Sequence, residues 1–210
     1  MTEHRNHEWN EMYASRERLF SAEPDAALVE LAAGLEPGRA LDLGAGEGRN
    51  SLWLARSGWE VTAIDLSDVA LGRLADAAAR AGLTLTTVVG DIEEYLAHAA
   101  RIDLVVLANL HPLPEERTRL FRLAAEALVP GGHLFLVGHH LDSLGRAGPP
   151  QAERLYTEET LRDAFPGLEL LRLERRAGHI GDTAEPLVDV IAWAVRSGDP
   201  GDTASGRPAS

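Results

Sequence analysis

Apolar residues along most of the chain fall alternately into short continuous runs and into runs with helical spacing. The short apolar runs predict buried strands at 39–43, 59–65, 83–90, 101–108 and 133–138. The segments with helical spacing predict helices at 50–58, 68–82, 92–100 and 114–129. Gly58, Gly82 and the run Pro130-Gly131-Gly132 mark the ends of three of these helices. Strands that alternate with helices predict a doubly wound, Rossmann-like sheet that is mostly parallel and covered on both faces.

The alternation changes after residue 140. A Gly/Pro-rich loop is expected at 141–151 and a short helix at 157–165. Strands are expected at 168–176 and 186–196, and the nine residues between them are too few for a helical crossover, which predicts an antiparallel pair. We therefore expect an N-terminal lid or docking segment at 1–23, one domain at 24–196, and a disordered polar tail at 197–210.

Composition excludes several kinds of chemistry. The 210 residues include no cysteine and no lysine, which excludes thiolate nucleophiles, iron–sulfur clusters, Schiff-base lysines and the lysine of a P-loop. The net charge of −13 disfavours nucleic acid as a partner. The apolar runs are too short to cross a bilayer, and Met1–Asn10 holds no apolar signal core, so we expect a cytoplasmic protein without a membrane partner.

The turn after the first predicted strand, in ALDLGAGEGRN (40–50), is the first candidate ligand site. Its pattern is D-x-G-x-G-x-G, and Arg49 occupies the position where a dinucleotide fingerprint has its third glycine. Asp42 and Glu47 would also repel a pyrophosphate. The turn therefore argues against NAD and ATP.

Three acids follow the first three strands and suit a different nucleoside. Asp42 can favour an ammonium group, Asp65 can accept both hydroxyls of a ribose, and Asp91 can accept from an adenine amino group. The alternative for each acid is a helix N-cap or a surface charge, although Asp68 rather than Asp65 is placed to cap the second helix. With the glycines, these acids predict a pocket for S-adenosylmethionine.

At this point the chain resembles the class I S-adenosylmethionine-dependent methyltransferases, in particular the small bacterial branch of tellurite-resistance and thiopurine-type enzymes. The resemblance runs from about residue 7 to 196 and rests on ALDLGAGEGRNSLWLARSGWEVTAIDLS, GDIEEY, RIDLVVLANLHPLP, LVPGGHLFLVGHH and LYTEETLRDAF. It implies a seven-stranded sheet with the last strand antiparallel. The expected cofactor-binding residues are Trp9, Tyr13, Asp42, Gly44, Ala45, Gly46, Arg49, Asp65, Leu66, Gly90, Asp91, Ile92 and Asn109.

The entrance segment HEWNEMYASRERLF (7–20) places Trp9 and Tyr13 on one helical face. This face is either a lid whose rings lie near the sulfonium or a docking surface that buries both rings against the sheet. In the family the segment often reads W-D-x-R-Y. Here Asn10 and Met12 stand in place of the D and R, which puts a salt-bridging role of that pair in doubt. Arg16, Arg18 and Arg49 are the candidates to meet the methionine carboxylate.

Histidines gather where the methyl group should point. His111 follows the fourth strand and His139 and His140 follow the fifth, with His179 as a possible fourth member. We expect His111 to act as a base or to orient the substrate, and His139 to line the site. The alternatives are structural: His139 as a partner of the 141–151 loop and His111 as a satisfied polar residue. His140 stands where related sequences often have an acid. No metal site is expected, even with Asp142 nearby, because no regular ligand spacing appears.

The expected function is methyl transfer from S-adenosylmethionine to a small molecule, by direct displacement at an oxygen, nitrogen or sulfur atom. The acceptor atom stays open, and the chain is expected as a monomer or homodimer. The alternatives are a protein of the same fold that binds the cofactor for regulation or for a non-methylating reaction, and an NAD-dependent oxidoreductase. An RNA methyltransferase is disfavoured by the charge and by the lack of an appended basic domain.

Overall fold

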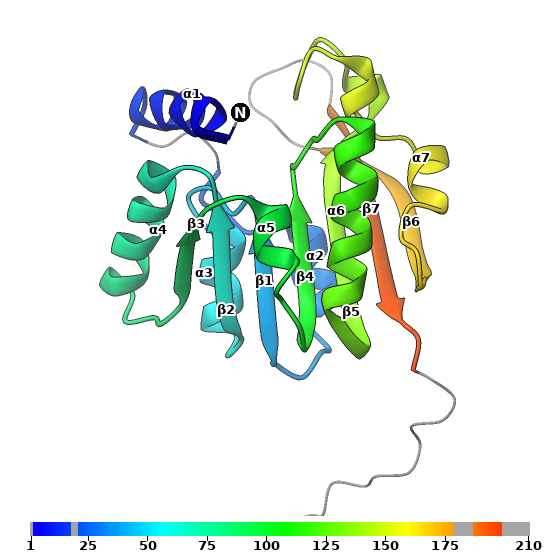
Figure 1. Ribbon diagram of the computed structural model, residues 1–210, viewed down its shortest axis with the longest axis horizontal. Helices are drawn as coiled ribbons and strands as arrows, with labels where there is room; N and C mark the ends of the chain where they lie inside the picture. Colours follow the sequence, from blue (N-terminus) through cyan, green and yellow to red (C-terminus); the bar gives the residue numbers. More distant parts are fainter. Residues whose placement is uncertain (1, 18–20, 179–186, 199–210) are drawn as a thin grey trace, which may run out of the picture.

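A single mixed sheet of seven strands organises the chain in the computed structural model, which describes residues 2–17, 21–178 and 187–198 (Figure 1). The strand order is β3-β2-β1-β4-β5-β7-β6. The strands are β1 (Arg39–Leu43), β2 (Glu60–Asp65), β3 (Thr86–Val89), β4 (Ile102–Ala108), β5 (Leu128–His139), β6 (Leu168–Gly178) and β7 (Leu187–Arg196).

The strand directions confirm the predicted topology. Strands β1 to β5 pair in parallel, whereas β7 is antiparallel to both β5 and β6. From β1 the chain winds outward to β2 and β3, and it then returns to place β4 on the other side of β1. This reversal of the strand order between β1 and β4 is where a doubly wound sheet opens a crevice at the carboxyl ends of its strands.

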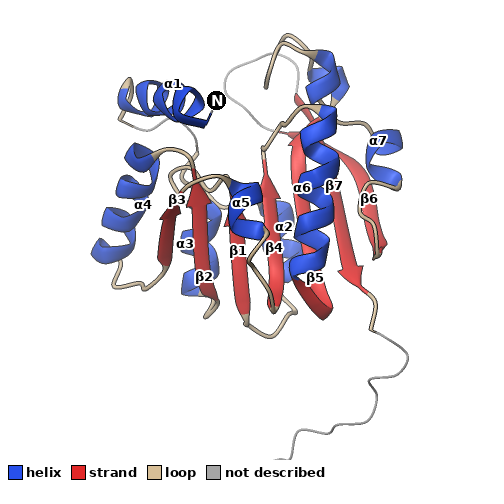
Figure 2. Ribbon diagram, viewed as in Figure 1, coloured by secondary structure: helices blue, strands red, loops and turns tan. Residues whose placement is uncertain are grey.

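Helices cover both faces of the sheet (Figure 2). They are α1 (Thr2–Ala14), α2 (Ala26–Ala32), α3 (Arg49–Arg56), α4 (Asp68–Arg80), α5 (Ile92–Leu96), α6 (Pro114–Ala127) and α7 (Glu158–Arg162). On one face α5, α6 and α7 pack over β1, β4 and β5 around Phe121 and Phe165. On the other face α2 and α3 pack over the same strands, and α4 joins α3 over β2. Helix α1 lies apart from these layers, above the carboxyl ends of β2 and β3 and against α4 (Figure 1).

Several element ends differ from the sequence prediction. The helix expected at 114–129 ends at Ala127, and β5 begins at Leu128 rather than at residue 133. Pro130, Gly131 and Gly132 are part of β5, in a register shift between the pairs Ile102↔Leu128 and Leu104↔His133. The extra residues are accommodated as a bulge, which Gly131 supports with a φ of 79°.

Two helices show the limits of the periodic pattern at the start of the chain. Helix α2 was not predicted, and it begins where the Asp25 side chain accepts a hydrogen bond from the Ala27 N–H. Helix α1 ends at Ala14, so it covers only the first half of the entrance segment. The tail expected to be disordered lies, from residue 199 on, outside the described residues.

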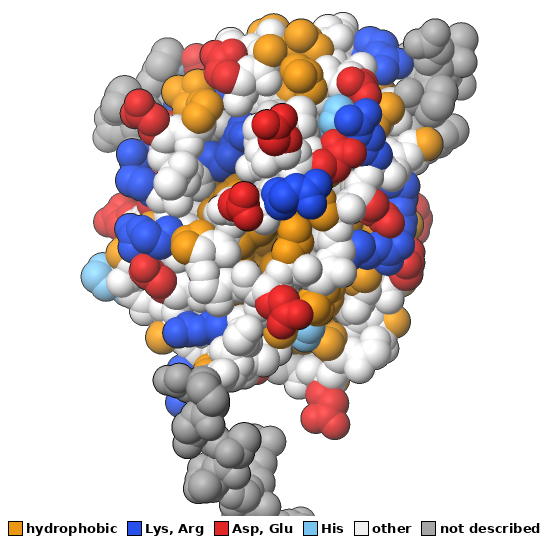
Figure 3. Space-filling view, turned by 90° about the vertical axis from the view of Figure 1, so that its right-hand side faces the viewer, with side chains coloured by type: hydrophobic (Ala, Val, Ile, Leu, Met, Phe, Trp, Pro, Cys, Tyr) orange, Lys and Arg blue, Asp and Glu red, His pale blue; other side chains and the backbone are white. Residues whose placement is uncertain are grey.

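Strand β6 forms one edge of the sheet, which faces the viewer in Figure 3. Charged side chains of both signs are interspersed over this side of the molecule. Arg172 and Arg176 of β6 pair with Glu174 of the same strand and with Glu30 of α2, at 2.7–3.1 Å. Charges along an edge strand discourage pairing with another sheet.

Candidate active site

The glycine turn is tied to the neighbouring strand by its own backbone. The N–H groups of Gly44 and Ala45 both donate to the Ile64 carbonyl, at 2.8 and 3.0 Å, and the Gly46 N–H donates to Asp65 Oδ2 at 2.8 Å. Gly44, Gly46 and Gly48 have φ values of 71°, 55° and 77°, the left-handed region that favours glycine. These amides are used within the fold and are not offered to a phosphate, in agreement with the sequence argument against a pyrophosphate ligand.

The acids beside the turn are buried. Asp42 is 2% exposed and accepts from Ser51 Oγ at 2.6 Å, and burial raises the pKa of its carboxyl to about 6. Asp65 is 9% exposed, accepts from the Gly46 and Ser67 N–H groups, and also has its pKa raised by burial. Because burial makes the ionised forms costly, a cationic ligand beside these carboxylates would offset that cost.

The helix caps separate the roles of the acids. Ser67 caps α4 by accepting from the Ala70 N–H, so Asp68, expected as the cap, is instead the first residue of the helix. Asp65 does not cap α4 and faces the glycine turn. Asp91, in contrast, is the N-cap of α5: its Oδ1 accepts from the Glu93 and Glu94 N–H groups, at 2.9 and 3.2 Å. The capping alternative therefore describes Asp91 and not Asp65.

Helix α1 lies beside the glycine turn and is held there by side-chain hydrogen bonds. Asn6 Nδ2 donates to the Leu66 carbonyl at 2.5 Å, and Asn10 accepts from Ser67 Oγ at 2.6 Å. Tyr13 is 4% exposed, and its hydroxyl oxygen lies 2.6 Å from where a Cβ on Gly46 would stand. Trp9 lies 6.0 Å from the Tyr13 ring but is 38% exposed. The docking alternative, in which the sheet buries both rings, is thus wrong for Trp9.

Asn10, which stands where the family often has an acid, makes hydrogen bonds in place of a salt bridge. Besides accepting from Ser67 Oγ, its amide nitrogen donates to Asp68 Oδ1 at 2.5 Å. Met12, in the other altered position, is 44% exposed. A second link comes from Arg73 of α4, which pairs with Glu47 at 2.9 Å and donates to the Arg16 carbonyl at 2.9 Å. Sequence reasoning missed Arg73, because its partners lie 26 and 57 residues away.

The other expected cofactor residues lie around the same crevice. Arg49 is the first residue of α3 and approaches Asp25 at 3.9 Å, a weak ion pair. Arg18 is outside the described residues. Asn109 follows β4 with a φ of 57° and donates its N–H to the Val137 carbonyl. Ala45, Leu66, Gly90 and Ile92 are all partly exposed, in the turn and after β2 and β3.

Two of the predicted histidines come together. The rings of His111 and His139 are stacked, with centroids 5.2 Å apart and an interplanar angle of 11°. His111 Nδ1 donates to the Arg154 carbonyl at 3.3 Å, and its Nε2 accepts from the His139 N–H at 3.4 Å. Both nitrogens thus engage the backbone, and burial followed by the proximity of His139 lowers the pKa of His111 to about 4. His111 is therefore neutral near pH 7.

His139 has a different environment. Its Nδ1 donates to Asp189 Oδ1 at 2.8 Å, and the two residues lie directly opposite each other on β5 and β7. The side chain of His139 is 12% exposed. Gly148 closes over its ring edge, since a Cβ there would lie 2.8 Å from His139 Cδ2. The expected contact of His139 with the 141–151 loop is thus present, but its hydrogen bond goes to Asp189.

His140 has other partners than this pair and is 2% exposed. Its Nε2 donates to Glu158 at 3.1 Å, and its Nδ1 accepts from the Asp142 N–H. Arg175 forms ion pairs with the carboxylates of Asp142 and Glu158, at 2.8 and 2.5 Å. His140 therefore fixes the segment after β5 to α7. His179, the possible fourth histidine, lies outside the described residues.

A set of side chains that the sequence did not single out holds the loop after β4 in place. Arg154 Nε donates to the His111 carbonyl at 2.7 Å, and the Tyr156 hydroxyl donates to the Leu110 carbonyl at 2.5 Å. The Arg117 guanidinium lies 4.5 Å from the centre of the Tyr156 ring. Leu110 in turn lies 3.0 Å from where a Cβ on Gly44 would stand. The loop thus links the glycine turn to the two histidines.

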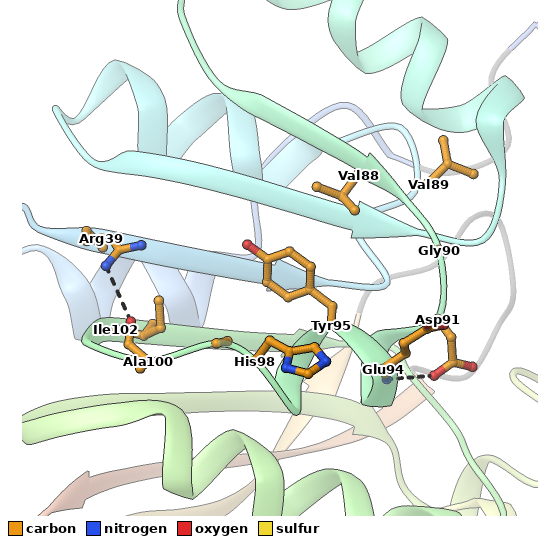
Figure 4. A pocket seen from close by; sticks show the side chains of 11 residues that line it. Arg39, Val88, Val89, Gly90, Asp91, Glu94, Tyr95, His98, Ala100 and Ile102 are labelled. Carbon is orange, nitrogen blue, oxygen red and sulfur yellow. Dashed lines mark hydrogen bonds between the residues drawn. The ribbon is translucent and has the colours of Figure 1, made fainter.

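A cavity of about 540 Å³ lies beside α5 rather than over the glycine turn (Figure 4). Asp91 and Gly90 are at one end, Arg39 is at the other, Tyr95 projects from α5, and His98 projects from the turn that follows α5. It shares only Gly90 and Asp91 with the expected cofactor residues. Because Arg39 is at the amino end of β1, this cavity extends from the carboxyl end of β3 towards the opposite edge of the sheet.

No group of three or more histidine, cysteine, aspartate or glutamate side chains in the described part of the chain is placed to hold a metal ion. No helix within the same residues is both long and apolar enough to span a bilayer.

Comparison with known proteins agrees with this geometry. Residues 40–132 match a family model described as a methyltransferase domain. The chain is 38% identical over 111 residues to ribosomal RNA small subunit methyltransferase C of Alcanivorax borkumensis, covering 50% of this chain and 33% of that protein. It is 34% identical over 110 residues to ubiquinone biosynthesis O-methyltransferase of Cronobacter sakazakii, covering 51% of this chain and 45% of that protein. The chain thus spans less than half the length of these relatives.

Solved structures show the same fold. TehB from Haemophilus influenzae superimposes with a TM-score of 0.69 at 22% identity, over 81% of this chain and 62% of that chain. A SAM-dependent methyltransferase from Methanosarcina mazei gives a TM-score of 0.68 at 22% identity, over 80% of this chain and 97% of that chain. The predicted resemblance and fold class are confirmed.

The residues present fit S-adenosylmethionine, the cofactor that such a domain implies. The turn carries no side chain of its own at Gly44, Gly46 and Gly48, and the buried carboxylates of Asp42 and Asp65 suit a ligand with a sulfonium and an ammonium group. Residues 40–132 form a methyltransferase domain, in a chain with the fold of the class I S-adenosylmethionine-dependent methyltransferases.

Proposed function

We propose that this protein transfers the methyl group of S-adenosylmethionine to a small-molecule acceptor. The observation that carries the proposal is the hydrogen bond from the Gly46 N–H to Asp65, at 2.8 Å, which joins the glycine turn to the acid at the end of β2. This bond fixes one oxygen of the Asp65 carboxylate and holds the side chain beside the glycine turn. In the proposed complex Asp65 accepts hydrogen bonds from the ribose hydroxyls. Asp42 accepts from the ammonium group, either directly or through a water molecule.

The remaining cofactor contacts are assigned by position. Leu66 and Ile92 would flank the adenine, with Gly90 and Asp91 at its edge, because these residues follow β2 and β3. Arg49 is the proposed partner of the methionine carboxylate, since its bond to Asp25 is long at 3.9 Å. Ala45 and Asn109 are assigned by their positions after β1 and β4.

Helix α1 is the proposed lid. Asn6 and Asn10 fasten it to the turn between β2 and α4, and Tyr13 closes over Gly46. Trp9 keeps an exposed ring beside Tyr13 and would cover the cofactor from outside. A closed lid excludes water from a reactive sulfonium and holds the reactants in line.

The acceptor is assigned as a small molecule for two reasons. The net charge of −13 disfavours a polyanion, although one relative is a ribosomal RNA methyltransferase by name. The likeness to an O-methyltransferase covers a similar share of this chain and supports a small acceptor.

The test is production of S-adenosylhomocysteine from S-adenosylmethionine, with a panel of phenols, amines, thiols and ribosomal RNA as acceptors. We expect turnover with one of the small-molecule classes and none with RNA. Turnover with RNA alone would overturn the assignment of the acceptor. Tight binding of the cofactor without turnover of any acceptor would favour a protein that binds it for another purpose.

A further inference from the structure

We propose that His139 and Asp189 form a general-base pair and that the acceptor is therefore methylated on a hydroxyl group. This inference rests on the proposed function, because it concerns the reaction at the same site. Asp189 was not among the residues expected from the sequence. The pair is built by the fold, since β5 and β7 place the two residues directly opposite each other.

The hydrogen bonds decide which histidine can take a proton. The Nδ1 of His139 donates to Asp189 at 2.8 Å, which fixes the tautomer whose Nε2 carries a lone pair. Among the residues that the structure describes, none pairs with this Nε2. His111, in contrast, uses both ring nitrogens on backbone groups of Arg154 and His139. Of the two stacked rings, only His139 has an acceptor nitrogen to spare.

The groups around His139 suit a general base. The carboxylate of Asp189 stabilises the imidazolium that forms, as the orienting acid does in a catalytic triad. The stacked ring of His111 is neutral, so it adds no second positive charge beside that imidazolium. Arg154 Nε holds the His111 carbonyl at 2.7 Å, which keeps the supporting ring in place.

The position of the pair agrees with a role in transfer. His139 ends β5, and its stacking partner His111 belongs to the loop whose Leu110 touches the glycine turn. The side chains of His139 and Asp189 keep 12% and 21% of their surface exposed, so both remain partly accessible. The neighbouring pair His140–Glu158 has the same chemistry, but its imidazole is 2% exposed and its second nitrogen accepts from the Asp142 N–H.

The reaction then balances as a direct displacement. The acceptor hydroxyl oxygen forms a bond to the methyl carbon while the bond from that carbon to sulfur breaks, and the electron pair of the broken bond stays on sulfur. The hydroxyl proton moves to Nε2 of His139. The resulting imidazolium, paired with Asp189, returns the proton to water after the products leave. A hydroxyl needs such a base, since it is a poor nucleophile until its proton is removed.

The experiment compares Asp189→Asn and His139→Gln with Glu158→Gln, a control that removes the carboxylate from the buried neighbouring pair. The acceptors are substituted phenols that range from fully protonated to ionised at the assay pH, with an amine and a thiol added. We expect Asp189→Asn to lower kcat on the protonated phenols by about 10² or more, with KM for S-adenosylmethionine unchanged. The loss should shrink for the ionised phenols, and Glu158→Gln should stay within a few-fold of the natural protein.

A spectroscopic measurement gives a readout that does not depend on the acceptor. Nitrogen-15 NMR of the imidazole groups should show His139 protonated at Nδ1 and unprotonated at Nε2, with this preference lost in Asp189→Asn. A proton on Nε2 in the natural protein, or an equal loss of kcat along the whole phenol series, would overturn the proposal. So would methylation of the amine or thiol with no phenol methylated. Failure of S-adenosylhomocysteine to bind would instead defeat the proposed function and leave the tautomer result standing.

Discussion

The contact between Gly46 and Tyr13 gives a prediction whose size follows from the structure. Gly46 has a φ of 55°, and an alanine there would pay about 1–2 kcal/mol for the left-handed backbone. Its Cβ would also stand 2.6 Å from the Tyr13 hydroxyl oxygen, and displacing a packed group typically costs about 1–3 kcal/mol more. Gly46→Ala should therefore lower the free energy of unfolding by about 2–5 kcal/mol.

Tyr13→Phe separates the two contributions. It removes the oxygen at 2.6 Å, and the next ring atom, Tyr13 Cζ, is 3.6 Å from the Cβ position, which is an ordinary contact. In the Tyr13→Phe background the cost of Gly46→Ala should fall to the backbone part, about 1–2 kcal/mol. Urea unfolding of the four proteins in this double-mutant cycle measures the coupling. Costs that add to within about 0.5 kcal/mol would refute the close approach of Tyr13 to the glycine turn.

Three further predictions concern titration and capping. Because burial raises the pKa of Asp42 to about 6, its carboxyl is mostly protonated at pH 5 and mostly ionised at pH 7. Calorimetry should therefore show the affinity for S-adenosylmethionine rising about tenfold from pH 5 to pH 7. Asp42→Asn should abolish this rise in affinity. The same pH dependence in Asp42→Asn would show that Asp42 does not interact with the positive charge of the ligand. Because the pKa of His111 is lowered to about 4, the unfolded chain takes up a proton below pH 6.5 that the folded ring resists, and stability falls as the pH falls towards 4. Between pH 7 and pH 5 this contribution is about 2 kcal/mol, measured as the difference in urea stability between the natural protein and His111→Asn, and equal pH slopes would contradict it. Ser67→Ala should lower the free energy of unfolding by about 1 kcal/mol through the lost N-cap of α4. Because Ser67 Oγ also donates to Asn10, amide hydrogen exchange in α1 should become faster as well. Unchanged exchange in α1 would show that this bond does not hold the helix.

The sheet was predictable because its signals are local. The apolar runs at 39–43 and 101–108 and the glycines between helices and strands mark β1, β4 and their neighbours without knowledge of the fold. The start of β5 was not predictable in the same way. Pro130-Gly131-Gly132 read as a turn, yet pairing with β4 draws these residues into the strand as a bulge.

The site residues also differ in how far along the sequence their partners lie. The glycine turn and Asp65 are close in sequence to the strand ends that position them, so their proximity was predictable. Asp189 was not, because its pairing with His139 depends on the register of two strands 50 residues apart. Arg154 and Tyr156 are similar cases, since each reaches the loop after β4 from more than 40 residues away. The presence of Asn10 in place of an acid was visible in the sequence, but its hydrogen bonds to Ser67 and Asp68 could not be predicted without the position of α1.

The most direct test of the account is a calorimetric titration of the purified protein with S-adenosylhomocysteine and, separately, with NAD⁺. We predict that S-adenosylhomocysteine binds and that Asp65→Ala weakens its binding at least tenfold, while NAD⁺ gives no heat of binding. Binding of NAD⁺ that is lost in Asp65→Ala, with no uptake of S-adenosylhomocysteine, would contradict the assignment of this site.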